Sequence, residues 1–398
     1  MPWKKQSVIG ERRRLMLVLL RKEKSVCYWC RVFGVSRKTA YKWRRRFLRG
    51  GQRALRDCTR RPKRMPRRLS GRESRRIEYW RRKHPHWGPK KLRVQLQRGG
   101  RATPSLRTIA RQLKRAGLVK MAPRRPPRVC VRIQRKRVTA QYPNHVWTVD
   151  FKGWFRAGNG ERCEPLTVRD LFSRYGLVVR LLPSQHWRPV QAVFARLFQA
   201  QGMPEVIRVD NGGPFASKGP GGLSRLSVWW TRLGIRVEFT RPACPQDNGA
   251  HEQFHRVMKK ETLNPVAWSR QGQQHRTTSW LKQYNRNRPH EALGQKRPRE
   301  LYRKSRRCFP TKLAAVRYRP ADQVRRVRSN GEIRWQGRKR FVGEAFVGQM
   351  VALRGWRQGV WSVRFIKLLI GHLHQQDAGA MRPVLYRYHH TLYPKAKA

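Results

Sequence analysis

The sequence of 398 residues predicts a multidomain protein with an all-α N-terminus, an α/β core and a small all-β barrel at the C-terminus. Three observations lead to this prediction. Helical periodicity with serine N-caps dominates the first third of the chain. From His145 onward, short strands alternate with helices. After residue 312, short strands separated by glycine turns return.

Charge is the strongest feature of the composition. Lys and Arg number 94 against 21 Asp and Glu, a formal net charge of +73. The excess is uneven, with +42 in residues 1–149, +13 in 150–302 and +18 in 303–398. A chain so charged repels itself unless a polyanion neutralises it, so we expect nucleic acid as its partner. No run of about 18 apolar residues is present, so we expect no membrane partner.

Cysteine usage indicates the compartment. The chain has seven cysteines, an odd number, and no segment with the architecture of a signal peptide. Free thiols are typical of a reducing environment, so we expect a cytoplasmic protein associated with the nucleoid.

Residues 1–57 are predicted to form a helix-turn-helix unit. Helices over 11–22 and 26–33 are followed by Gly34, and Ser36 caps a helix that runs to Arg49. In this last helix, spacing turns the apolar residues Ala40, Trp43 and Phe47 inward. An ordinary helical bundle with a basic surface is the alternative. The side chains left to face outward, as a helix that enters a major groove requires, are Arg37, Lys38, Tyr41, Lys42, Arg44 and Arg45.

A second unit of the same kind is predicted over residues 70–119. Ser70 and Glu73 form the pattern of a capping box at its first helix, and Ser105 is placed to cap its last. Two such units in tandem would recognise a longer DNA site than one. The Pro- and Arg-rich residues 120–144 show no periodicity and are predicted to be an extended basic linker.

Residues 145–302 show the order of elements of a mixed α/β sheet of the ribonuclease H type. Residues 313–375 contain four short strands and the hairpin signal Asn330-Gly331, which predict a small β-barrel. Residues 376–398 are predicted to be a tail. In the core, strands are expected over 145–155, 165–168, 176–182, 205–210 and 236–240, and helices over 189–201, 223–233 and 248–263.

Three of the acids lie where they could converge. Asp150 interrupts an apolar strand, Asp210 ends a strand before an Asn-Gly-Gly turn, and Glu252 lies in the first turn of a helix. Phosphodiester cleavage needs an activated nucleophile and a stabilised leaving oxygen, which two divalent ions held by carboxylates can supply. Each acid alone could equally cap an element or form an ion pair. The cations expected beside Glu252 on the same helix face are His255, Arg256 and Lys259.

The segments around these acids resemble the three catalytic segments of the retroviral-integrase superfamily. They are His-x-Trp-x-x-Asp-Phe-Lys-Gly at 145–153, Asp-Asn-Gly-Gly-Pro-Phe at 210–215, and Pro-Gln-Asp-Asn-Gly-Ala-His-Glu at 245–252. More narrowly, the chain is similar to bacterial insertion-sequence transposases of the DDE type with paired helix-turn-helix units. The likeness spans about residues 1–375 and includes the stretches 87–92, 165–168, 173–175, 288–294 and 298–302.

The resemblance implies that Asp150, Asp210 and Glu252 are the catalytic, metal-binding triad. It implies two Mg²⁺ ions, with Mn²⁺ as a substitute, and no nucleotide cofactor. Asp150 would bridge both ions, and Asn248 would help position the helix that carries Glu252. The implied reaction is hydrolysis at the element ends to free 3′-hydroxyls, which then attack target DNA. The implied partners are double-stranded DNA of both kinds and further copies of the chain, as a homo-oligomer on DNA.

Some features depart from the family pattern or permit a different function. The interval from Asp210 to Glu252 is 42 residues, long for the superfamily, and the Gly-rich stretch 219–225 resembles an insertion that accounts for it. Asp247 is either a fourth, competing carboxylate or an exposed loop acid. The excess of Arg and Lys leaves open an inactive, decaying copy. The sequence also permits a non-catalytic helix-turn-helix regulator, an RNA-binding protein, or a ribonuclease H-like nuclease that cuts without joining.

Overall fold

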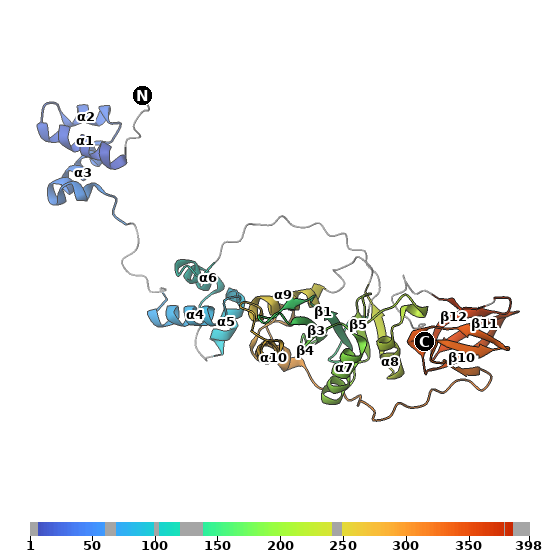
Figure 1. Cartoon of the computed structure of the whole chain (residues 1–398). Coiled ribbons are helices and arrows are strands. Elements are labelled where there is room, and N and C mark those ends of the chain that lie inside the picture. Colours follow the sequence, from blue (N-terminus) through green and yellow to red (C-terminus); the bar gives the residue numbers. More distant parts are fainter. Residues whose placement is uncertain are drawn as a thin grey trace. The chain divides into compact units, whose positions relative to one another are not determined.

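The structure, a computed structural model, describes residues 7–59, 69–98, 103–119, 138–240, 249–377 and 379–384 (Figure 1). The chain divides into two units, Met1–Glu73 and Ser74–Ala398, which we describe separately. Within the described ranges, no helix is both long and apolar enough to cross a membrane. Most of the predicted basic linker and most of the predicted tail lie outside the described residues.

The first unit is a three-helix bundle. Each helix begins at a serine whose hydroxyl accepts a hydrogen bond from a backbone N–H of the first turn, the usual way of satisfying such donors. Ala40 and Trp43 are buried in the bundle and Phe47 packs against them, as predicted. The helices are α1 (Val8–Arg21), α2 (Val26–Val32) and α3 (Arg37–Gly50), followed by a 3-10 turn over Gly51–Leu55.

A second group of three helices follows. Its helices are α4 (Gly71–Lys83), α5 (Pro89–Gln97) and α6 (Leu106–Arg115). The backbone N–H of Ser70 donates to Glu73 and that of Glu73 to Ser70, so the predicted capping box at α4 is present. The apolar face of these helices is buried at Ile77, Trp87, Leu92, Leu96, Ile109 and Leu113.

The core contains a mixed six-stranded sheet, in agreement with the predicted α/β class. Strand β1 pairs antiparallel with β3 and parallel with β5, and β6 extends the sheet beyond β5. Strand β4 covers the other edge of β3, and the short β2 also pairs with β3. The strands are β1 (Val146–Phe151), β2 (Phe155–Arg156), β3 (Arg162–Asp170), β4 (Gly176–Leu182), β5 (Val206–Val209) and β6 (Arg236–Phe239).

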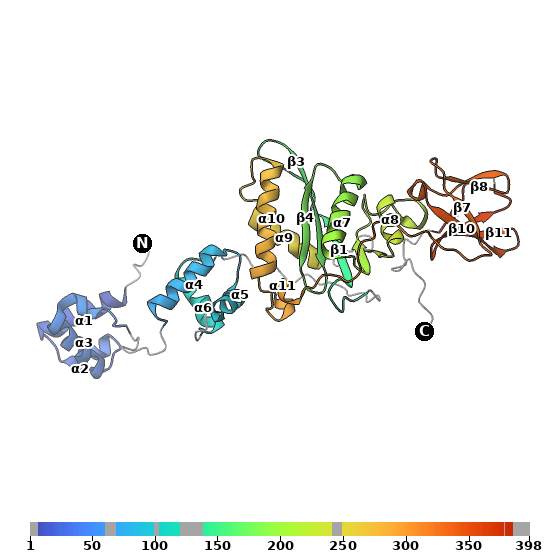
Figure 2. The ribbon, with the colours of Figure 1, turned by 90° about the horizontal axis from the view of Figure 1, so that it is seen from below.

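Helices cover both faces of this sheet. Trp147 of β1 packs against Phe198 of α7, whereas Val179 of β4 packs against Phe254 of α9 and Trp280 of α10. Figure 2 shows α9 and α10 on one side of the strands and α7 on the other. The sequence patterns did not predict α10, because most of its residues are polar. The helices are α7 (Trp187–Gln201), α8 (Arg225–Arg232), α9 (Gly249–Thr262), α10 (Arg270–Asn287) and the short α11 (Pro298–Leu301).

The C-terminal segment is all-β, as predicted, with strands in two sheets. Five form an antiparallel sheet in the order β13-β12-β11-β10-β7, and β8 pairs with β9 around Gln336-Gly337. Asn330-Gly331 does not join a hairpin, because β7 and β8 on either side of it pair with different strands. The strands are β7 (Gln323–Arg326), β8 (Glu332–Trp335), β9 (Arg338–Phe341), β10 (Met350–Arg357), β11 (Val360–Phe365), β12 (Leu368–His374) and β13 (Arg382–Pro383).

Candidate active site

Two of the predicted carboxylates lie at the same edge of the sheet. Strands β1 and β5 are parallel neighbours in register, with Thr148 opposite Arg208. Asp150 and Asp210 each follow two residues later, so the register places them side by side where the two strands end. The carboxyl ends of parallel strands are a common position for ligand sites in α/β proteins.

Glu252 approaches from a third element. It lies in the first turn of α9 and its side chain is exposed. Phe254 and Met258 of the same helix are buried against Val179 and Trp280, which holds α9 on the sheet face that carries Asp150. The preceding segment, including Asp247 and Asn248, lies outside the described residues.

The three carboxylates are close enough to affect one another's protonation. Burial, together with the negative charges of Asp210 and Glu252, raises the pKa of Asp150 to about 7, against the opposing effects of the backbone N–H of Phe151 and the charge of Lys152. Burial also raises the pKa of Asp210, opposed by the backbone N–H of Gly212. A carboxyl group whose pKa is brought near neutral pH by burial and by like charges is typical of functional sites.

The donor set at this edge suits a hard divalent cation. Oδ1 of Asp210 is buried and accepts no hydrogen bond from the residues that the structure describes. Buried oxygens normally have a partner, so this one is available to a cation. Among the described residues, no group of three or more His, Cys, Asp or Glu side chains is arranged to hold a metal ion. Mg²⁺ usually keeps several of its waters, so a site at these carboxylates would need water or DNA oxygens as further ligands.

A buried hydrogen-bond network ties α9 to the strands beside Asp150. Thr167 of β3 lies opposite Asp150 in the ladder, and its hydroxyl donates to the Asp150 carbonyl oxygen at 2.9 Å. The same hydroxyl oxygen is 2.6 Å from Nε2 of His251 and 2.7 Å from Nε2 of His255. His251 Nδ1 is 2.8 Å from the hydroxyl of Thr148 on β1. The network fixes the helix turn that carries Glu252.

The expectation that His255 is a phosphate-binding cation is wrong. Burial, together with the positive charges of Lys152 and Arg169, lowers its pKa to about 3, so the imidazole is neutral at physiological pH. Because the Thr167 hydroxyl uses its one hydrogen to donate to the Asp150 carbonyl oxygen, it can only accept from the two histidines. His251 and His255 therefore each donate to it from Nε2. Nδ1 of His255 then presents a lone pair 3.8 Å from Oδ2 of Asp150. Helical spacing alone could not show that this position is covered by β3.

Replacing Thr167 by valine is expected to lower the free energy of unfolding by about 1–3 kcal/mol, because buried polar groups lose their partner. Urea unfolding would measure the change. Thr167→Ser keeps the hydroxyl and should retain most of the stability. Thr311→Val, at an exposed position, is the matched control. Equal stability of the Thr167→Val and Thr311→Val proteins would contradict the network.

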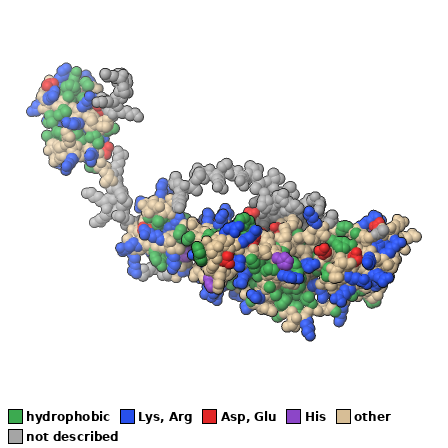
Figure 3. All heavy atoms as spheres, in the orientation of Figure 1, with side chains coloured by type: hydrophobic (Ala, Val, Ile, Leu, Met, Phe, Trp, Pro, Cys, Tyr) green, Lys and Arg blue, Asp and Glu red, His purple; other side chains and the backbone are tan. Residues whose placement is uncertain are grey.

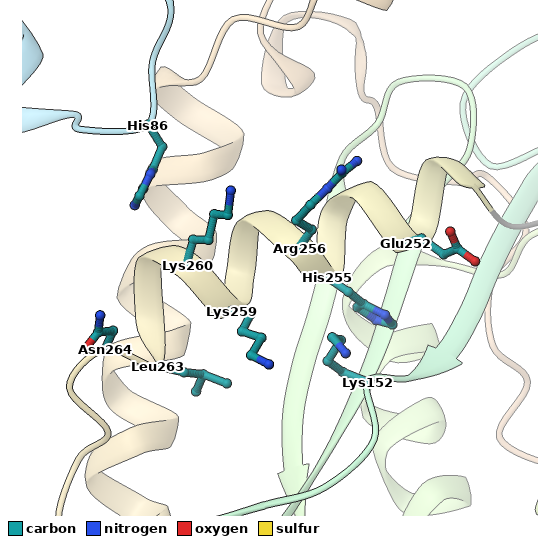
Figure 4. A pocket seen from close by; sticks show the side chains of 9 residues that line it. All are labelled: His86, Lys152, Glu252, His255, Arg256, Lys259, Lys260, Leu263 and Asn264. Carbon is teal, nitrogen blue, oxygen red and sulfur yellow. The ribbon is translucent and has the colours of Figure 1, made fainter. Parts of the chain in front are cut away.

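A basic pocket adjoins Glu252. It has a volume of about 890 Å³. Figure 4 shows its lining side chains along α9, on the strand end at Lys152 and, from the segment between α4 and α5, at His86. Arg256 and Lys259, the two remaining predicted cations of α9, are exposed there. The lining residues are His86, Lys152, Glu252, His255, Arg256, Lys259, Lys260, Leu263 and Asn264.

The predicted groove-facing residues of α3 are mostly exposed. Arg37, Lys38, Lys42 and Arg45 are exposed, and Tyr41 retains 48% of its accessible surface. Arg44 differs, because it is half-buried against the bundle. Figure 3 shows many Lys and Arg side chains and few Asp and Glu on the visible face of the molecule.

Five family models match the chain and together follow its order of elements. Two describe an integrase core domain, over residues 140–245 and 233–298. A helix-turn-helix domain matches residues 11–65 and a homeodomain-like domain matches residues 39–113. The C-terminal domain of IS481 family transposases matches residues 322–378.

Similar proteins come from bacterial insertion elements. A 31.7 kDa protein of insertion element IS407 from Burkholderia multivorans is 28% identical over 222 residues, covering 55% of this chain and 76% of the relative. A 39.2 kDa protein of IS476 from Xanthomonas euvesicatoria is 27% identical over 187 residues, covering 46% of this chain and 51% of the relative.

The solved structures that the chain matches include viral integrases. The HTLV-2 integrase catalytic core domain in complex with magnesium is 16% identical with a TM-score of 0.33, and covers 42% of this chain and 100% of that one. The simian T-cell lymphotropic virus intasome in complex with a PP2A regulatory subunit is 15% identical with a TM-score of 0.36, and covers 78% of this chain and 99% of that one. The chain thus carries matches to helix-turn-helix domains, to an integrase core and to an IS481-type C-terminal domain, and in this combination it is similar to insertion-sequence transposases of the integrase type.

Proposed function

We propose that the protein cuts the ends of an insertion sequence and joins them to target DNA, with divalent cations held by Asp150, Asp210 and Glu252. The observation that supports this proposal is that the charges of Asp210 and Glu252 both act on the carboxyl group of Asp150, and that Glu252 also lines a basic pocket. In a chain with 94 basic and 21 acidic side chains, an open cluster of acids opposes the general charge pattern. A bound cation would relieve the mutual repulsion that the cluster imposes on the folded protein.

In this proposal the carboxylates bind the metal ions and the basic side chains bind the DNA. Asp150 is central, since both other acids act on its pKa, and Asp210 offers the buried Oδ1. Divalent cations at these carboxylates, Mg²⁺ or Mn²⁺, would activate the attacking water or 3′-hydroxyl and stabilise charge on the leaving oxygen. Arg256 and Lys259 lie where they can bind phosphates of the reacting strand. No nucleotide cofactor is part of the proposal.

The outward-facing residues of α3 are proposed to bind double-stranded DNA of the element ends. Arg37, Lys38, Lys42 and Arg45 extend into solvent from one helix, as a recognition helix requires, and Tyr41 lies among them. Arg44 can contribute with the exposed part of its side chain. Two ends must be held together for joining, so the proposed active form is a homo-oligomer on DNA.

Nicking of supercoiled plasmid by the full chain tests the catalytic proposal. We expect nicking with Mg²⁺ or Mn²⁺ and none with chelator. Asp210→Asn preserves the shape of the side chain and removes its charge, so it should bind DNA like the wild type and lose nicking. Glu344→Gln, which removes an exposed charge from the 3-10 turn between β9 and β10, is the control that should keep full activity.

Each remaining outcome points to a different function. Tight DNA binding without nicking by wild type would contradict the proposal and favour a regulator or an inactive copy. Nicking that persists in Asp210→Asn would move the chemistry away from the triad. Metal-dependent nicking without transfer of labelled 3′-hydroxyl ends to a second DNA would indicate a nuclease that cuts without joining.

A further inference from the structure

In the structure, two stretches of the chain contact each other, and the proposed chemistry uses neither of them. They are residues 87–92, at the start of α5, and residues 288–294, after α10. Lys90 of the first donates to the carboxylate of Glu291 in the second, although the two are 201 residues apart. Near the other end of α5, Arg98 donates to Glu300 at 3.3 Å. Helix α5 is therefore bound at both ends to the segment that follows α10.

The contact also contains buried charge. Arg288 is 6% exposed and donates to Glu261 of α9 at 2.7 Å. Lys91 points into this region, where burial and the charge of Arg288 lower its pKa to about 8, partly offset by Glu261 and Glu291. Desolvated charges are costly unless they are compensated, so the cations Arg288 and Lys91 depend on the nearby carboxylates of Glu261 and Glu291.

This contact extends the basic pocket. His86 lies just before α5, and it lines the pocket together with the consecutive residues Lys259 and Lys260 of α9 (Figure 4). Glu252 is the only acid among the lining residues of this pocket. Lys152, Arg256, Lys259 and Lys260 all line this pocket, and such a concentration of positive charge attracts a phosphodiester backbone.

We propose that the second helical group, docked on the core of the same chain through Lys90–Glu291 and Arg98–Glu300, supplies His86 to a phosphate-binding groove in which Lys152, Lys259 and Lys260 hold the backbone of the DNA strand that enters the active site. This inference rests on the proposed function, because it says where the substrate of that site lies. It adds that the second helical group is part of the substrate groove and does not act only as a separate DNA-binding module.

Carbodiimide cross-linking of the full chain tests the docking. The reagent joins an amine and a carboxylate in direct contact, so we expect an isopeptide bond between Lys90 and Glu291. In a mixture of isotope-labelled and unlabelled protein, the linked peptides should both be labelled or both be unlabelled. Linked peptides of mixed labelling in the proportion expected for random pairing of chains, or no Lys90–Glu291 linkage, would overturn docking within one chain. Both side chains are more than half exposed, so their substitution should preserve the fold.

Acetylation footprinting with chelator tests the groove, since lysines that bind phosphate react more slowly. With duplex DNA bound, we expect Lys152, Lys259 and Lys260 to be protected and Lys282, an exposed lysine of α10, to react as in free protein. Lys90→Glu should weaken the docking by up to about fivefold, the range for an exposed ion pair, and reduce protection at Lys260. Lys90→Glu with Glu291→Lys should restore it. Full reactivity of Lys259 and Lys260 on DNA would overturn the groove.

His86 has its own test. His86→Ala should weaken Lys260 protection, whereas His275→Ala, at an exposed position of α10, should not. An equal effect of both substitutions would exclude His86 from the groove. These measurements need no metal, so they separate the two proposals. Asp210→Asn should give the wild-type footprint, and a normal footprint without nicking by wild type would refute the catalytic proposal alone.

Discussion

Without divalent metal, Asp150→Asn is expected to be more stable than the wild type at pH 8, by up to about 4 kcal/mol. The pKa of Asp150 is about 7 in the folded protein, against about 3.9 in an unfolded chain. Its side chain is 20% exposed, so solvent screens it little. Ionisation therefore costs folding free energy, and asparagine removes that cost.

The pH dependence of this effect has a definite sign. Between about pH 4 and 7, folded Asp150 holds a proton that the unfolded chain has released, so wild-type stability falls as pH rises through this window. The asparagine variant lacks this group. The difference between the two proteins should therefore be small at pH 4, grow toward pH 7 and stay constant above it.

Urea unfolding with chelator at pH 5 and pH 8 would measure the difference. Glu344→Gln removes an exposed acid and is the control, which should change stability equally at both pH values. Adding Mg²⁺ or Mn²⁺ should stabilise the wild type and leave Asp150→Asn nearly unchanged, because a ligand that binds only the folded state favours it. No pH-dependent difference between variant and wild type would contradict the clustering of the carboxylates.

Arg208→Met is expected to lower the free energy of unfolding by about 3–5 kcal/mol. Arg208 of β5 donates to Glu238 of β6 at 2.7 Å, and their side chains are 8% and 3% exposed. Arg208 also donates to the carbonyl of Val138 at 2.7 Å. Without the guanidinium, the Glu238 carboxylate remains buried without its cation. Since Arg208 lies two residues before Asp210, loss of this pair should also disturb the candidate site.

A double variant distinguishes the loss of the pair from loss of packing. Arg208→Met combined with Glu238→Met replaces both charges by apolar groups of similar volume, and should recover most of the stability. Arg180→Met, on an exposed position of β4, should change stability by less than about 0.5 kcal/mol. Urea unfolding measures all three. A single variant as stable as the double one would contradict a strong buried ion pair.

Local signals in the sequence predicted much of the fold. Serine caps at residues 36 and 105 and the capping box at Ser70 are present in the structure. The strand predicted over 176–182 has the same bounds as β4. Such signals depend on residues a few positions apart, so they can be recognised without knowledge of the tertiary fold. Local signals of this kind also predicted that the three carboxylates lie at the ends of strands or helices. Their catalytic role is a proposal.

Features that depend on packing were missed. Helix α10 has little apolar periodicity and is held by Trp280 and Tyr284, which pack against Phe254 of α9. Strands β9 and β12 were also missed. Their pairing with β8 and β11 defines them more clearly than their composition does.

The sequence by itself determined the fold class, the resemblance to insertion-sequence transposases and the three candidate carboxylates, because these are encoded in patterns local to each segment. Only the tertiary structure decided the state of the site. Strand β3 covers His255 and makes it neutral, and burial beside two other acids raises the pKa of Asp150 to about 7. It also brought Lys90 to Glu291 across 201 residues. Protonation and docking depend on distances in space and on solvent exclusion, which the order of residues does not contain.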